Sequence, residues 1–159
     1  MSKRFFTFQN LCFSAVLAAL YVALTVLLPF SYGPVQFRIS EALTLLPVLF
    51  PQSIPGLTLG CLIANLLGSS TPWDVIFGTL TTLLAAIATY RLRQNIWLAA
   101  AAPVLGNGVV VGLVLHLTLG FPLVSTMLSV AFGEACVLYL LGVPLVRALK
   151  KITLPSWLA

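Results

Sequence analysis

The first residue that could carry chemistry is an acid in apolar surroundings. Glu134 is one of only three acidic residues in the chain, and it lies inside the apolar segment 123–149. It stands about eleven residues into that segment, on the order of 16 Å along a helix axis, and so near the middle of a membrane. A carboxylate is costly there, so Glu134 should face a bundle interior and be protonated, paired or opposite a ligand. We interpret it as a binding residue; the alternative is a protonated acid bonded to a neighbouring helix.

Two asparagines in apolar segments could add hydrogen-bonding groups to the same site. Asn107 lies between Gly106 and Gly108, halfway along segment 96–119, and Asn65 lies near the end of segment 55–67. Because an amide both donates and accepts, two of them can recognise a polar ligand. The glycines allow close backbone approach and favour a binding role for Asn107. Hydrogen bonding between helices is the alternative for both residues, and for Asn65 the two interpretations stay open.

A third group of polar residues lies between the first two apolar segments. Arg38 and Glu41 are three residues apart, so on a helical turn they would share a face and could neutralise each other. Alternatively, the two charges line the mouth of a pocket, with Tyr32 and Phe37 supplying flat surfaces for a ring. Both interpretations stay open.

Asp74 follows Trp73 at the start of the fourth apolar segment. An acid at this position interacts favourably with the positive end of the helix dipole, and we expect Asp74 to cap the helix. A tryptophan beside an acid would also suit a planar cation.

Sequence patterns of common catalytic and metal sites are absent from the chain. His116 is the only histidine, and nine steps of 100° place it opposite Asn107 on a helix. GxSxG, HExxH and the GxxxxGK[ST] P-loop do not occur. The three cysteines lie in apolar runs and suggest packing. We therefore expect no enzyme, no cofactor and no metal site. If the chain takes part in active transport, the energy must come from elsewhere.

The composition indicates which elements must position these residues. The 159 residues are 60% apolar and 7% charged, which predicts one all-α domain, residues 1–159, in a bilayer. The net charge of +5 does not indicate nucleic-acid binding, because the basic residues lie at the ends of apolar segments. Ser40 should cap the second segment and Pro55 should lie in the first turn of the third. We predict six transmembrane segments: 10–28, 42–50, 55–67, 75–90, 96–119 and 123–149.

The basic residues predict the orientation of this bundle. Lys3 and Arg4 precede the first segment, Arg91 and Arg93 join the fourth to the fifth, and residues 147–151 close the sixth with three more basic residues. With six crossings all three groups lie on one side, which the positive-inside rule makes cytoplasmic. Both termini are then inside. If the short second and third segments form a re-entrant pair, the orientation is unchanged.

One small-residue pattern could serve a partner. Ala15, Ala19 and Ala23 repeat every fourth position of the first segment, which lets another helix approach closely in lipid. Packing within the bundle is the alternative.

Four stretches resemble one known family. They are YGPVQFRISEALTLLPVLFP (32–51), IPGLTLGCLIANLLG (54–68), DVIFGTLTTLLAA (74–86) and GEACVLYLLGVPL (133–145). Together they resemble the QueT family, substrate-binding S-components of energy-coupling factor (ECF) transporters that are linked to uptake of queuosine precursors. The likeness covers nearly the whole chain, and segment 96–119 matches more loosely.

The resemblance implies a multi-pass protein of the bacterial plasma membrane with an outward-facing pocket. It also implies that Ala15, Ala19 and Ala23 dock on a transmembrane T-component, while two ATPase subunits supply hydrolysis. The implied ligand is a 7-deazaguanine such as preQ1, whose aminomethyl group is cationic. Glu134 or Glu41 would accept two parallel hydrogen bonds from the guanine-like edge, and a second acid would face the ammonium group.

Other functions remain open from the residues alone. A self-sufficient secondary transporter would use Glu134 as a proton site. An intramembrane enzyme has few candidate residues, and a scaffold would leave Glu134 and Arg38 without a task.

Overall fold

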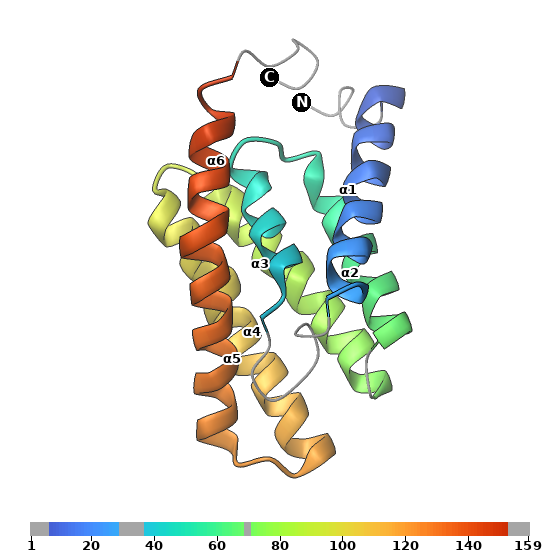
Figure 1. Ribbon diagram of the computed structural model, residues 1–159, viewed down its shortest axis with the longest axis vertical. Coiled ribbons are helices and arrows are strands. Elements are labelled where there is room, and N and C mark those ends of the chain that lie inside the picture. The colour runs from blue at the N-terminus through green and yellow to red at the C-terminus, as the bar shows by residue number, and fades with distance from the viewer. Residues whose placement is uncertain (1–6, 29–36, 69–70, 153–159) are drawn as a thin grey trace.

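The computed structural model describes residues 7–28, 37–68 and 71–152, and every regular element in these ranges is a helix (Figure 1). In chain order the elements are α1 (Phe8–Val26), η3 (Ile39–Val48), α2 (Ser53–Gly68), η4 (Asp74–Gly78), α3 (Thr79–Arg91), α4 (Ile96–Leu119), α5 (Leu123–Val137), η5 (Leu138–Gly142) and α6 (Val143–Leu149). η3 is a 3-10 helix, whereas η4 and η5 are π-helical turns that run directly into the neighbouring α-helices. The all-α prediction is confirmed.

Within the described residues, three helices are long and apolar enough to cross a membrane, judged by length and composition. They are α1, α4 and the continuous helix Leu123–Leu149 that α5, η5 and α6 form together. The last two have the bounds predicted from the sequence. η3 and α2 are apolar but shorter, with 10 and 16 residues. Pro55 lies in the first turn of α2, as predicted.

Side chains at the helix ends explain where the long helices begin and end. The Thr7 side chain accepts a hydrogen bond from the Asn10 N–H at the start of α1, and Asn95 caps the start of α4 in the same way. α4 ends at Gly120, whose φ of 73° is accessible to glycine at little cost. These local signals place α4 and α5 as antiparallel neighbours.

A glycine pair on α2 brings this helix into backbone contact with α1. A Cβ atom at Gly56 would lie 2.3 Å from the Ser14 carbonyl oxygen, and one at Gly60 would lie 3.0 Å from the Ala18 carbonyl oxygen. Without hydrophobic driving force between helices in lipid, such small-xxx-small faces supply close van der Waals packing. α1 is thereby held against α2 on its Ser14 and Ala18 side.

A second glycine pair does the same for α4 and α5. A Cβ atom at Gly108 would lie 2.9 Å from the Ala131 side chain, and one at Gly112 would lie 2.8 Å from the Met127 Cα. The close approach of these two helices sets the positions of the polar residues that they carry.

η3 lies in the middle of the bundle. It contacts α1, α2, α3, α4, α5, η5 and α6, and it runs between α1 and the α5–η5–α6 helix in Figure 1. Residues 40–48 are all buried. The predicted Ser40 cap is wrong, because the hydroxyl of Ser40 bonds to that of Thr25 on α1 and the start of η3 has no side-chain cap.

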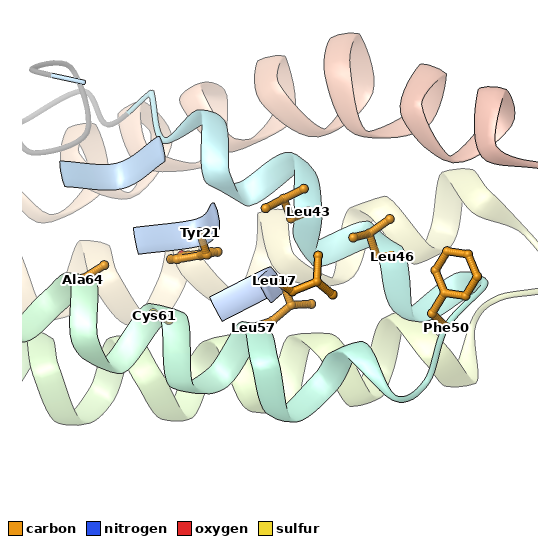
Figure 2. Packing of buried hydrophobic residues seen from close by; sticks show 8 residues of the cluster. All are labelled: Leu17, Tyr21, Leu43, Leu46, Phe50, Leu57, Cys61 and Ala64. Atoms are coloured by element: carbon orange, nitrogen blue, oxygen red, sulfur yellow. The ribbon is translucent and has the colours of Figure 1, made fainter. Parts of the chain in front are cut away.

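The largest apolar cluster joins η3 to α1 and α2. Figure 2 shows Ala64 at one end of this cluster, with Tyr21 and Cys61 near it, and Phe50 at the other end. The cluster fixes the apolar side of η3 against α1 and α2.

Candidate functional site

Glu41, in the first turn of η3, is held by a residue of α1. The Tyr21 hydroxyl donates a hydrogen bond to Glu41 Oε1. Both side chains are buried, with exposed fractions of 0% for Tyr21 and 2% for Glu41. Nearby, the hydroxyls of Thr25 and Ser40 lie 2.7 Å apart. α1 therefore positions the start of η3 through two polar contacts.

Glu134 on α5 is held by Asn107 on α4. Asn107 Nδ2 donates to Glu134 Oε1 at 2.5 Å, and both side chains are buried. Gly108, next to Asn107, and Gly112, one turn further along α4, allow the close approach of α4 and α5 that this bond needs. For Asn107, the interhelical hydrogen bond considered from the sequence is present.

Arg38 brings a positive charge to the same region. It is the last residue before η3, and the Glu41 N–H donates to its carbonyl oxygen at 2.9 Å. Its guanidinium interacts electrostatically with the carboxylates of both Glu41 and Glu134, and the two carboxylates interact with each other. The structure thus brings together three ionisable residues that lie up to 96 positions apart in the sequence (134 minus 38).

Asn65 on α2 forms a polar contact with α3 through a cysteine. Asn65 Nδ2 lies 3.4 Å from Cys61 Sγ and 3.4 Å from the Asp74 carbonyl oxygen, and donates to both. Thr82 on α3 donates to Cys61 Sγ at 3.2 Å. Cys61 also packs with Tyr21 and interacts electrostatically with Glu41, which links this cluster to the acid on η3.

Among the described residues of these contacts, three buried oxygen atoms have no hydrogen-bond partner. They are Glu41 Oε2, Glu134 Oε2 and Asn65 Oδ1, on η3, α5 and α2. The three residues are at most 6% exposed. An unsatisfied buried acceptor costs about 1–3 kcal/mol, more for a charged one, so such an atom usually has a purpose. Here the unsatisfied atoms are all acceptors and come from three different elements.

The remaining aromatic and acidic candidates are not part of this group. Asp74 Oδ2 accepts from the Thr71 hydroxyl at 3.1 Å, and Thr71 Oγ1 accepts from the Asp74 N–H at 3.3 Å, which is the reciprocal pattern of a helix cap. Trp73 is 55% exposed and stacks on Phe77. Phe37 is 37% exposed. Tyr32 lies outside the described residues.

The alanine ladder of α1 faces away from the bundle. Ala15 and Ala19 are exposed and Ala23 is half-buried, whereas Ser14, Ala18 and other residues on the opposite side pack on α2 and η3. Packing within the bundle therefore does not account for the ladder.

Comparison with known proteins gives the family. The chain matches the family described as "QueT transporter" over residues 11–151. This chain belongs to the QueT family. Over 73 residues it is 48% identical to the queuosine precursor transporter QueT of Lactococcus lactis subsp. cremoris (strain MG1363). That alignment covers 44% of this chain and 43% of the relative, less than half of either. No solved structure gives a significant match.

Membership of a transporter family agrees with the apolar helices, and it confirms the resemblance drawn from the sequence. Sequence reasoning missed some residues of the polar contacts described above. Chief among these are Tyr21 and Cys61, which read as ordinary members of apolar segments. The two glycine pairs, Gly56 with Gly60 and Gly108 with Gly112, were a detectable signal, because each has the GxxxG spacing of close helix contacts.

Proposed function

We propose that this QueT-family chain is the substrate-binding S-component of an ECF importer and captures a 7-deazaguanine queuosine precursor, with preQ1 as the preferred ligand. The observation that carries the proposal is the set of three unpartnered buried acceptors, Glu41 Oε2, Glu134 Oε2 and Asn65 Oδ1. A ligand that satisfies them must bring several donors into a buried place.

The chemistry of preQ1 matches this requirement. Its guanine-like edge carries a ring N–H and an exocyclic amine, and its aminomethyl group is a cation. When both acids are ionised, two carboxylates and one guanidinium favour a cationic ligand over an anionic one. Charge-assisted hydrogen bonds to such acceptors are about twice as strong as neutral ones.

The proposal includes six membrane crossings with both ends of the chain in the cytoplasm. The basic residues at the end of α6 and those before α4 support it, because they lie at the same end of the bundle. The Arg147 guanidinium lies 5.2 Å from the centre of the Trp97 ring, so the end of α6 is beside the start of α4. Arg91 and Arg93 precede α4 and are exposed. Basic residues on one side, with aromatic residues at the same level, are typical of a cytoplasmic interface.

The proposal also includes docking of α1 on a T-component of an ECF complex with two ATPase subunits. The exposed ladder of Ala15, Ala19 and Ala23 supports it, since small residues in lipid favour a partner helix. The chain has no P-loop of its own.

Ligand binding by the purified protein tests the proposal. We expect preQ1 to bind in detergent, and Glu134→Gln to weaken binding at least about tenfold through loss of a charged acceptor. Asp74→Asn, the same change at a helix cap outside the proposed site, should leave the affinity unchanged. An unchanged affinity in Glu134→Gln would contradict the proposed site.

Vesicles test the transport role against the proton-coupled alternative. With the protein alone we expect preQ1 binding but no accumulation, and with an ECF module and ATP we expect accumulation that Ala19→Trp abolishes without loss of binding. Accumulation driven by a proton gradient in vesicles with this chain alone would favour the secondary transporter.

A further inference from the structure

Each buried carboxylate in the site has one oxygen occupied and one free. Glu41 Oε1 accepts from the Tyr21 hydroxyl and Glu134 Oε1 accepts from Asn107 Nδ2, whereas both Oε2 atoms are buried without a partner. The occupying groups are neutral donors on the adjacent helices, α1 and α4. The same arrangement therefore occurs twice, on unrelated parts of the chain.

This arrangement limits what each acid can do. A carboxylate that accepts two parallel hydrogen bonds from a guanine-like edge needs both oxygens. With Oε1 of each acid already accepting one hydrogen bond, Oε2 is the oxygen of Glu41 and of Glu134 that has no partner. The two-bond recognition by one acid that the family resemblance suggested would require Oε1 to accept a second hydrogen bond beside the one from its protein donor.

The donors also fix the direction of each free oxygen. A glutamate side chain rotates about its last torsion with little preference, so its carboxylate needs a partner to hold one orientation. Tyr21 is fully buried and Asn107 is 5% exposed, so both donors are fixed by packing. Their contacts stop the carboxylates from turning their free oxygens away.

We propose that Tyr21 and Asn107 are matched positioning residues, each of which occupies one oxygen of an acid so that Glu41 and Glu134 read two different donors of the ligand. The proposal rests on the function proposed above. It adds Tyr21 to the site and moves Asn107 from ligand contact to positioning.

Three ligands separate the two acids. preQ1 carries both the ammonium and the exocyclic amine, 7-cyano-7-deazaguanine lacks the ammonium, and the hypoxanthine analogue of preQ1 lacks the exocyclic amine. The protein variants are Tyr21→Phe and Asn107→Leu, which remove the donor and keep most of the volume. Thr89→Val removes another buried hydrogen bond, to the Ala99 carbonyl oxygen, and serves as the control.

We expect each positioning variant to weaken preQ1 binding about tenfold, as for loss of an oriented charged acceptor. Each variant should bind one of the two analogues as tightly as the wild type does. That analogue should be a different one for Tyr21→Phe and for Asn107→Leu. Thr89→Val should leave all three affinities unchanged. Tyr21→Phe and Asn107→Leu weakening all three ligands by one common factor would overturn the proposal, because that result indicates a purely structural role.

A measurement without ligand separates this proposal from the proposed function. In infrared spectra of the ligand-free protein, Glu41→Gln and Glu134→Gln identify the band of each acid. Tyr21→Phe should shift the Glu41 band only, and Asn107→Leu the Glu134 band only. If the wild type binds none of the three ligands, the proposed function fails. The infrared bands then decide whether the Tyr21–Glu41 and Asn107–Glu134 pairs exist. Bands that do not shift in the variants would overturn the pairing.

Discussion

At the scale of residues, the site combines carboxylates whose neighbours leave them half satisfied. Glu41, Glu134 and Asn65 each keep one buried acceptor without a partner while the other polar atom of the group is engaged. A chain that needed these residues only for packing would gain by pairing every atom, since each orphan costs about 1–3 kcal/mol. The unsatisfied atoms therefore support the proposed ligand, which is rich in donors.

Gly78 gives a test of the Asn65 position. A Cβ atom there would lie 2.9 Å from Asn65 Nδ2, the movable end of a side chain, so Gly78→Ala should displace the amide without disturbing the backbone. We expect several-fold weaker preQ1 binding, and a melting temperature that is unchanged or higher because alanine favours the helix by about 1 kcal/mol.

The control uses the amide itself. In an Asn65→Leu background, Gly78→Ala should have no further effect on the affinity measured by calorimetry. A full additional loss in that background would show that Gly78→Ala acts elsewhere.

At the scale of elements, η3 decides where the charges lie. A 3-10 helix has three residues per turn, so Arg38, which directly precedes η3, and Glu41 lie on one side of it. Runs of this kind longer than four residues are uncommon, and η3 has 10. It is supported by contacts with all the long helices and by the Thr25 to Ser40 bond.

The α1–α2 contact is the support most sensitive to added volume. A Cβ atom at Gly56 would meet the Ser14 backbone at 2.3 Å, and backbone cannot give way as a side chain can. We expect Gly56→Ala to destabilise the protein by about 2–3 kcal/mol, and thermal unfolding in detergent to show it as a melting temperature lower by roughly 5–10 °C.

Gly106→Ala is the matched control for this change. Its Cβ would contact only the Thr81 side chain, at 3.2 Å, so the loss should stay below about 1 kcal/mol. Equal losses at the two positions would contradict the assignment of Gly56 to a tight helix contact.

At the scale of the whole molecule, the helix ends fall into two groups. The start of α1, the α3–α4 connection and the end of α6 lie at one end of the bundle, and the α4–α5 turn lies at the other (Figure 1). The described basic residues, apart from Arg38, belong to the first end. Hence the charge distribution and the fold support the orientation proposed above.

Cysteine labelling tests that orientation. With the three native cysteines replaced by alanine, Gln94→Cys and Ser125→Cys place exposed thiols at opposite ends of the bundle. A membrane-impermeant maleimide on intact cells should label Ser125→Cys and leave Gln94→Cys unlabelled until the cells are opened. Labelling of Gln94→Cys alone in intact cells would reverse the proposed orientation.

The sequence by itself determined the helical class and the long apolar segments, because these follow from hydrophobicity. It also singled out Glu134 as a candidate, because a charge in lipid is costly. It also indicated the family, through local motifs. Neither hydrophobicity nor spacing could show that Tyr21 holds Glu41, or that Asn107 holds Glu134 rather than a ligand. Those pairings join elements that are distant in the chain. Only the packing of the helices decided them, and this packing depends on the glycine contacts and on the 3-10 helix η3.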